Sequence, residues 1–314
     1  MAYKVFVDGQ QGTTGLEIYQ RLEKRDDVEI LKIDPALRKD VSEKKRLINL
    51  SDVTILCLPD DAARESVALI ENPDVRVIDA STAHRTNDAW VYGIPEFSAA
   101  QREAIKNAKR VCVPGCYATG FNVIMHPLVK EGIVPKSYLA TCHAVSGYSG
   151  GGRQLIEAVE DPAQKYAFAS PSFYGLTLAH KHLPEMQKVS GLDNAPLFSP
   201  MVCNYYRGMN VAVPLFLSAL NKKMSAKGLS DFFADYYAGQ RFVLPQPFDA
   251  LKNFERGYVT AEGCNNTNEL KLFVFGNDEQ AIALSQLDNL GKGASGAAIQ
   301  LMNIMLGVDE EYSL

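Results

Sequence analysis

The stretch YKVFVDGQQGTTGLEIYQRLE, from Tyr3 to Glu23, decides the fold class of this sequence. Residues 3–7 predict a short buried strand, a glycine loop follows over 8–15, and a helical pattern begins at Leu16. Such a loop lets the backbone approach a pyrophosphate, and the helix N-terminus offers N–H groups and partial positive charge. The spacing G-x-x-G-x-x-G differs from the commoner G-x-G-x-x-G, and the alternative interpretation is a tight turn without a ligand. The residues expected to bind a dinucleotide here are Gly9, Gly12, Thr13, Thr14 and Gly15.

Outward from this stretch, strands and helices alternate at short spacing. Apolar runs at 28–33, 53–58 and 75–78 predict strands, and the pattern at 64–70 predicts a helix. This alternation indicates βαβ units and therefore a doubly wound, parallel, Rossmann-like α/β sheet. After about residue 118 the signals alternate less regularly, which indicates a separate α+β domain. Its predicted strands are 139–145, 197–202, 209–217 and 270–275.

The composition is that of an ordinary globular protein and excludes several classes. The chain has 314 residues, of which 46% are hydrophobic and 22% charged, and its formal net charge is −5. No overall positive charge favours nucleic acid or an anionic membrane, and no apolar run is long enough for a membrane-spanning helix. Six cysteines without a C-x-x-C pair, and no signal-peptide pattern, predict a reduced, cytoplasmic protein without a metal site. We therefore expect neither a nucleic-acid nor a membrane partner.

The end of the second strand bears on the choice between NAD and NADP. Asp34 lies where an acidic residue often binds the ribose 2′-hydroxyl of NAD. Arg38 and Lys39 follow shortly after, and cations there suit the 2′-phosphate of NADP. The basic residues of 38–46 can equally form a solvated face, so the local sequence leaves both cofactors open.

One cysteine differs from the others in its setting. An apolar strand at 110–113 meets Pro114 and Gly115, and a helical pattern starts after Cys116. A helix N-terminus stabilises a thiolate, and the thiolate is the nucleophilic form of cysteine. Cys116 is therefore a candidate nucleophile, and a buried structural cysteine is the alternative.

Five segments together resemble one family. The segment GCYAT at 115–119 is similar to the active-site motif of N-acetyl-γ-glutamyl-phosphate reductases, of the shorter of the family's two types. The glycine loop and three further segments resemble the same family, in an order that covers nearly the whole chain. These three are DASTAHR at 79–85, HKHLPE at 180–185 and DNLGKGASG at 288–296. The wider superfamily includes aspartate-semialdehyde dehydrogenase.

The resemblance implies NADPH-dependent reduction of N-acetyl-γ-glutamyl phosphate to N-acetylglutamate semialdehyde, with release of phosphate, in arginine biosynthesis. Cys116 would form a thioester, and His182 would be the acid/base, with Glu185 as a candidate orienting and substrate-binding carboxylate. His180 is the alternative acid/base, and a metal site at the two histidines lacks a third ligand. The resemblance also implies NADP(H) as cofactor and a homodimer or homotetramer.

Further residues take roles that the resemblance implies. Arg85 is the candidate for the substrate phosphate and Arg207 for its α-carboxylate, while Arg153 follows a glycine-rich loop that could hold an anion. The last helix is expected to return to the nucleotide sheet. This gives an NADP-binding domain of residues 1–117 and 288–314, and a catalytic and dimerisation domain of residues 118–287. The remaining expected cofactor-binding residues are Arg38, Pro59, Ser81, Asn289 and Gly293.

Other functions stay open at this point. A related acyl-phosphate reductase, similar to aspartate-semialdehyde dehydrogenase, would differ only in its pocket residues. A non-catalytic NADP-binding redox sensor would need neither Cys116 nor the 180–185 segment. A cysteine hydrolase would have no use for the glycine loop.

Overall fold

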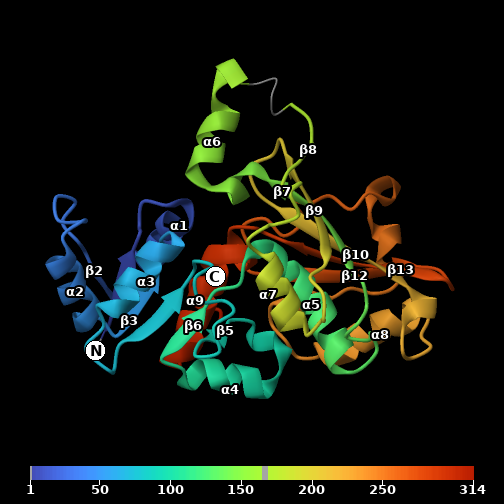
Figure 1. Cartoon of the computed structure of the whole chain (residues 1–314), viewed down its shortest axis with the longest axis horizontal. Coiled ribbons are helices and arrows are strands. Elements are labelled where there is room, and N and C mark those ends of the chain that lie inside the picture. Colours follow the sequence, from blue (N-terminus) through green and yellow to red (C-terminus); the bar gives the residue numbers. More distant parts are fainter. Residues whose placement is uncertain (1, 165–168) are drawn as a thin grey trace. The chain divides into compact units, whose positions relative to one another are not determined.

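The computed structural model describes residues 2–164 and 169–314, and the chain divides into two compact units (Figure 1). Unit 1 comprises residues 1–114 and 294–314, and unit 2 comprises residues 115–293. These limits differ from the predicted ones, because Cys116 begins a helix of unit 2 and residues 288–293 directly follow a strand of unit 2. Within the described residues, no helix combines the length and apolarity needed to cross a membrane.

Unit 1 is built on a six-stranded parallel sheet with the strand order β2-β1-β3-β4-β6-β5. The order runs outward from β1 in both directions, which confirms the predicted doubly wound class. The strands are β1 (Tyr3–Asp8), β2 (Val28–Leu31), β3 (Val53–Leu56), β4 (Arg76–Asp79), β5 (Val91–Tyr92) and β6 (Arg110–Cys112). The helices are α1 (Thr13–Leu22), α2 (Val41–Leu50), α3 (Asp60–Ala68), α4 (Ala99–Asn107) and α9 (Gly296–Leu306).

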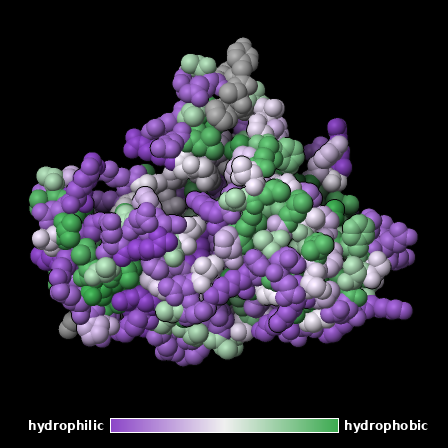
Figure 2. Space-filling model, in the orientation of Figure 1, coloured by the Kyte–Doolittle hydropathy of each residue, from purple (hydrophilic) through white to green (hydrophobic). Residues whose placement is uncertain are grey.

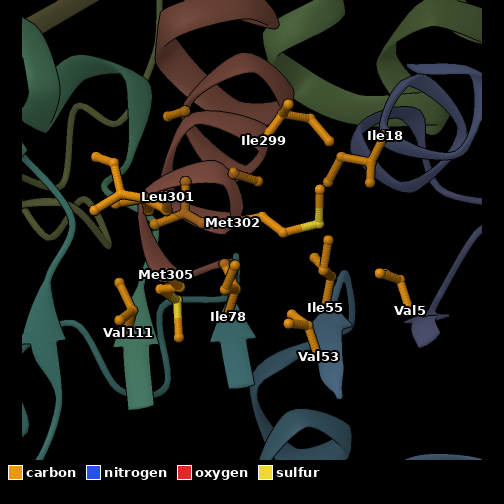
Figure 3. Close-up of a cluster of buried hydrophobic side chains, with 14 of the residues drawn as sticks. Val5, Ile18, Val53, Ile55, Ile78, Val111, Ile299, Leu301, Met302 and Met305 are labelled. Atoms are coloured by element: carbon orange, nitrogen blue, oxygen red, sulfur yellow. The ribbon is translucent and has the colours of Figure 1, made fainter. Parts of the chain in front are cut away.

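Apolar side chains cover both faces of this sheet, which is why its strands read as continuous apolar runs. On one face, Val5, Ile55 and Ile78 belong to a buried cluster with α9 (Figure 3). The buried residues that α9 contributes there include Ile299, Leu301, Met302 and Met305. A second cluster contains Leu47 and Ile48 of α2. The last helix thus completes the core of unit 1, although the whole of unit 2 precedes it in the sequence.

Unit 2 contains a seven-stranded mixed sheet with the order β11-β12-β13-β10-β7-β9-β8, as expected for an α+β domain. The pairs β7–β9 and β11–β12 are parallel, and the other neighbours are antiparallel. The strands are β7 (Thr141–Gly147), β8 (Ser172–Phe173), β9 (Leu197–Cys203), β10 (Met209–Phe216), β11 (Val243–Pro245), β12 (Leu270–Gly276) and β13 (Gln280–Leu287). The helices are α5 (Cys116–Lys130), α6 (Gly152–Glu160), α7 (Leu183–Ser190) and α8 (Ala226–Tyr236).

Helix α5 lies in the core of unit 2, close to the sheet. Of its 15 residues, 12 are buried. A Cβ at Gly120 would lie 2.6 Å from Ser285 Oγ of β13 and 2.7 Å from Val211 Cγ2 of β10, so glycine permits this close approach. Tyr237 adds a hydrogen bond of 2.6 Å from its hydroxyl to the Val123 carbonyl. The helix end that carries Cys116 is therefore fixed within unit 2.

Two segments differ from the sequence-based expectation. The basic run after residue 38 includes a helix, α2, which Asp40 caps by accepting a hydrogen bond of 2.8 Å from the Glu43 N–H. Residues 288–296 read as a loop before the last helix, but the structure has a π-helical turn at Gly291–Ser295, and α9 follows it. Gly293 of this turn packs against Cys116.

Candidate active site

The glycine loop of unit 1 leaves a helix N-terminus open. Gly9 adopts a φ of +91°, and a Cβ there would lie 2.2 Å from the Cys57 carbonyl oxygen, so this position requires glycine. A Cβ at Gly15 would lie 2.4 Å from Gly9 O, whereas at Gly12 the nearest atom would be 3.6 Å away. Gly12 precedes α1, and neither a side-chain cap nor an acidic residue occupies the first turn. The loop therefore fits the pyrophosphate of a dinucleotide.

Next to this loop, unit 1 contains a pocket of about 330 Å³. Its lining includes Gly9, and Arg38 Nη1 donates to Gln11 Oε1 at 2.8 Å, which holds the guanidinium near the loop. Asp34 is absent from the lining, and its carboxylate accepts a hydrogen bond of 2.8 Å from the Ala36 N–H. The pocket thus presents cations to a ligand, as a 2′-phosphate requires. The basic residues that line it are Arg38, Lys39 and Lys44.

Two more residues predicted to bind cofactor follow strands of unit 1. Pro59 is the residue before α3. Ser81 follows β4, and its N–H and hydroxyl donate to the Asp79 carboxylate at 2.9 and 2.7 Å. The same carboxylate lies 2.6 Å from His84 Nδ1, and the His84 ring stacks on Trp90. Ser81 therefore orders this loop, and its contact with cofactor stays a prediction.

Cys116 occupies the first position of α5, as the sequence predicts. Gly115 precedes the helix without a side-chain cap, and its N–H donates to Glu185 Oε2 at 3.2 Å. Glu185 is buried, and this hydrogen bond holds the main chain directly before Cys116. Burial raises the pKa of the Cys57 thiol to about 12 and that of Cys264 to about 11. Cys116 differs from these two because it lies at a helix N-terminus.

Two histidines lie beside the residue that follows Cys116. The centre of the Tyr117 ring lies 5.9 Å from both His180 and His182, and the two histidine rings are 4.8 Å apart. His180 Nδ1 accepts a hydrogen bond of 3.1 Å from the His182 N–H, which requires an unprotonated nitrogen. Burial, and secondly the charge of Lys181, lowers the pKa of His180 to about 4. Among the described residues, no cluster of three metal-binding side chains occurs.

The three candidate arginines lie in different settings. Arg207 Nη1 donates to Asn266 Oδ1 at 2.8 Å and to the buried Asp288 carboxylate at 3.2 Å, within unit 2. Arg153 lies on α6 with its side chain 72% exposed, where it pairs with Glu157.

Arg85 belongs to unit 1 and follows β4. Its Nε donates to Val113 O at 2.9 Å and its Nη2 to Ala80 O at 3.0 Å. These bonds fix the guanidinium at the carboxyl ends of two neighbouring strands, β4 and β6. Ligands bind at this edge in open α/β sheets.

Gly293 and Asn289, both predicted to bind cofactor, pack within unit 2. A Cβ at Gly293 would lie 2.8 Å from Cys116 Cβ, so the π-helical turn lies directly against Cys116. The Asn289 side chain accepts from the Gly208 N–H at 2.8 Å and donates to Ser149 Oγ at 2.9 Å. Gly293 therefore packs against Cys116, whereas Asn289 links the main chain before β10 to Ser149. The contact of both residues with cofactor stays a prediction.

Comparison with known proteins decides the family. The NAD-binding domain of semialdehyde dehydrogenases matches residues 4–108, and the dimerisation domain of the same enzymes matches residues 116–289. The chain is 48% identical over 318 residues to N-acetyl-gamma-glutamyl-phosphate reductase 2 of Nostoc sp., with 99% of each chain covered. The reductase 2 of Pseudomonas putida is 47% identical over 308 residues, with 96% of each chain covered. This chain belongs to the N-acetyl-gamma-glutamyl-phosphate reductase family.

Solved structures share the fold of this reductase family member. Aspartate semialdehyde dehydrogenase from Francisella tularensis superposes with a TM-score of 0.69 at 16% identity, over 98% of this chain and 100% of that one. The enzyme from Candida albicans, solved with NADP, gives a TM-score of 0.62 at 14% identity, over 98% and 99% of the two chains. At these identities the likeness establishes the fold.

Three aromatic residues at or near the position after Cys116 in this reductase family member had no predicted role. Tyr174 OH donates to Tyr117 OH at 2.9 Å, and the Phe198 ring lies 5.1 Å from that of Tyr117. Burial, followed by the charges of Tyr174 and Cys116, raises the pKa of Tyr117 well above its usual range, so it stays a neutral phenol. Only Tyr117 carried a sequence signal, its position next to Cys116.

Proposed function

We propose that this chain catalyses the NADPH-dependent reduction of N-acetyl-γ-glutamyl phosphate to N-acetyl-L-glutamate 5-semialdehyde, with release of phosphate, in arginine biosynthesis. The observation that carries the proposal is Cys116 at the start of α5, with the two histidines beside the neighbouring Tyr117, in a chain 48% identical along its length to a reductase of this name. The reaction needs a nucleophile, a proton shuttle, anion-binding groups and a hydride donor.

Cys116 is the proposed nucleophile. The start of α5 stabilises negative charge on its sulfur, because the first N–H groups of a helix carry partial positive charge. The thiolate attacks the acyl carbon, a C–S bond forms, and the C–O bond to phosphate breaks. Phosphate leaves and a thioester remains. Reduction at the thioester carbon gives a thiohemiacetal, whose collapse releases the aldehyde and restores the thiolate.

His182 is the proposed acid/base. It holds the thiol proton during the attack and shares a proton with the carbonyl oxygen during the reduction. His180 suits this role less, because its Nδ1 is engaged by the His182 main chain and its pKa of about 4 keeps it neutral near pH 7. Glu185 supports the reaction by fixing the Gly115 N–H at the start of α5.

The residues of unit 1 fit NADPH, which supplies a hydride when bound. The loop with Gly9, Gly12 and Gly15 and the open start of α1 suit the pyrophosphate, with Thr13 and Thr14 as added donors. Arg38 is the proposed contact of the 2′-phosphate, supported by its place in the pocket.

Arg207 and Arg85 are the proposed partners of the two anionic ends of the substrate. Arg207 suits the α-carboxylate, because its side chain is 16% exposed and Asp288 and Asn266 hold it in place. Arg85 suits the phosphate, because it is fixed at the carboxyl edge of the sheet. The exposed ion pair of Arg153 favours a surface role over substrate binding.

A homodimer is the proposed assembly, and the match to a dimerisation domain supports a homo-oligomer. On the sheet of unit 2, Phe216 and Ile282 lie on one face, 58% and 45% exposed, and Leu197 is 53% exposed. Figure 2 shows apolar residues gathered near β9 and β10. A second copy that stacks on this face would bury them. A homotetramer would need a further contact.

The cytoplasm is the proposed compartment. The six cysteines, Cys57, Cys112, Cys116, Cys142, Cys203 and Cys264, are all free, which suits a reducing environment.

The reverse reaction tests the proposed function. Purified protein, NADP⁺, inorganic phosphate and N-acetylglutamate semialdehyde should produce NADPH, followed by absorbance. Omission of phosphate should stop the reaction, because phosphate is a substrate in this direction. A redox sensor or a hydrolase would show no such requirement for phosphate. Aspartate semialdehyde in place of the acetylated substrate tests the related acyl-phosphate reductase. Equal or faster turnover of aspartate semialdehyde would replace the proposed function with that one.

A further inference from the structure

The structure separates the basic residues of α2 into two groups. Lys45 pairs with Glu71 and Arg46 with Glu43 on the surface of unit 1, and the two basic side chains are 41% and 58% exposed. Lys44 is 19% exposed and lines the pocket beside the glycine loop. A run of basic letters in the sequence gives no reason to distinguish Lys44 from Lys45.

Within this pocket Lys44 neutralises a carboxylate. Its Nζ lies 3.1 Å from Asp8 Oδ2, and Asp8 ends β1 directly before Gly9. Ser66 Oγ donates to the same oxygen at 2.9 Å, and the Asp8 side chain is only 9% exposed. These contacts fix the carboxylate at the pocket wall, where its charge acts on any ligand in the pocket.

The charge balance of the pocket depends on this ion pair. Its lining holds three cations, Arg38, Lys39 and Lys44, and one carboxylate, Asp8, so three minus one leaves a net charge of +2. A phosphate monoester carries roughly −1.5 to −2 charges at neutral pH. NADPH places such a group on its adenosine ribose, and NADH does not. The net charge therefore matches the phosphorylated cofactor.

We propose that the Asp8–Lys44 ion pair determines selectivity for NADPH over NADH, an inference that rests on NADPH as the cofactor of the proposed function. Asp8 repels the 2′-phosphate unless Lys44 cancels its charge. The two side chains are only 19% and 9% exposed, so the effective dielectric is lower than in bulk water and removal of Lys44 leaves an uncompensated repulsion. Arg38 and Lys39 then face the phosphate with a net charge of +1 instead of +2.

The test measures NADPH and NADH binding to the full-length protein by nucleotide fluorescence. In Lys44→Met, we expect the affinity for NADPH relative to NADH to fall by about tenfold or more, the scale of one charge-assisted contact. Lys45→Met, on the same helix, is the matched control and should leave this ratio unchanged. The double variant Asp8→Asn/Lys44→Met restores the net charge of +2, so its ratio should return close to that of the wild type.

Competition with fragments locates the effect. Adenosine 2′,5′-bisphosphate should displace NADPH from the wild type better than AMP does, and Lys44→Met should remove this advantage. If Lys44→Met does not fold, Asp8→Asn alone carries the test, because it raises the pocket charge to +3 and should increase the preference for NADPH.

An ion pair with a structural role alone would lower the unfolding temperature of Lys44→Met and leave the NADPH-to-NADH ratio unchanged, and this result would overturn the inference. A lost preference that the double variant fails to recover would overturn it as well. Wild-type protein that binds neither dinucleotide would instead refute the proposed function.

Discussion

Replacement of Gly293 by alanine tests whether the packing behind Cys116 positions its thiol. A Cβ on Gly293 would lie 2.8 Å from Cys116 Cβ and 3.3 Å from Cys116 Cα. Ordinary contact begins at 3.4 Å, so the two Cβ atoms must separate by 0.6 Å (3.4 − 2.8). Neither atom is the end of a flexible side chain, so the separation must come from movement of the main chain at the start of α5 or in the π-helical turn.

The expected effect on the rate follows from this displacement. A misplacement of about 1 Å at a reacting group can reduce the rate by about 10²-fold, so we expect kcat of Gly293→Ala to fall by about tenfold or more. Overpacking should also lower the free energy of unfolding by about 1–3 kcal/mol. The thiol would lie differently against the helix N-terminus, so its alkylation by iodoacetamide near pH 7 should slow.

Turnover, urea unfolding and the alkylation rate of Cys116, followed by mass spectrometry, form the assay. Gly228→Ala in α8 is the matched control: the nearest atom to its added Cβ is Met224 Cγ at 3.0 Å, on a side chain that can move. This variant should keep the wild-type rate of both reactions. A folded Gly293→Ala enzyme with wild-type turnover and alkylation would show that the turn does not position the thiol, and the reasoning would fail.

Four further predictions concern the nucleophile, the histidines and the cofactor. Cys116→Ser should abolish turnover while NADPH binding, read by fluorescence, stays near wild type, because a hydroxyl is a far weaker nucleophile; near-normal turnover would contradict the thioester route. His182→Asn should lower kcat by about 10²-fold or more and His180→Asn by less; the reverse ranking, in steady-state assays, would move the acid/base role to His180. The pKa of His180 is about 4 in the folded protein, below its ordinary value of 6.5, so the unfolded state binds the proton more strongly. The free energy of unfolding should therefore fall as pH drops from about 6.5 towards 4, and urea titrations should show a shallower fall in His180→Asn. Wild type should bind NADPH more tightly than NADH, at low and moderate salt, and Arg38→Ala should reduce that preference; equal binding of both by wild type would contradict the assignment.

The fold of unit 1 could be predicted because its strands are short, its central strands β1, β3 and β4 are largely buried, and clear turn residues separate them. Residues 3–7 correspond to β1 of unit 1, and in unit 2 the predicted helix N-terminus at Cys116 is confirmed. A glycine directly precedes each of the two helices concerned: Gly12 precedes α1 and Gly115 precedes α5. The signal for each helix start therefore lies within a few residues of it. Local signals of this kind do not depend on the rest of the chain.

The exact limits of the units, three and six residues from the predicted ones, could not be predicted, because they depend on contacts between distant segments. Residues 288–293 read as a loop before the last helix, yet they belong to unit 2, and Gly293 at their end packs against Cys116. Nothing near Gly293 in the sequence indicates that a residue so far from it will occupy the space of its missing side chain. The same holds for Glu185, whose carboxylate accepts from the Gly115 N–H.

The cofactor site shows that the type of a residue and its position in the sequence do not reveal whether its side chain points into the pocket. Asp34 and Arg38 compete for one role in the sequence, and the structure distinguishes them by local hydrogen bonding: Asp34 accepts from Ala36 within its own turn, whereas Arg38 is held at the loop by Gln11. Lys44 and Lys45 are neighbours on one helix, but successive helical residues point about 100° apart, so one enters the pocket and the other pairs at the surface. The charge that a phosphate meets in the pocket therefore depends on which face of α2 carries Lys44 and on the position of Asp8 at the end of β1. Both are fixed only when the sheet forms.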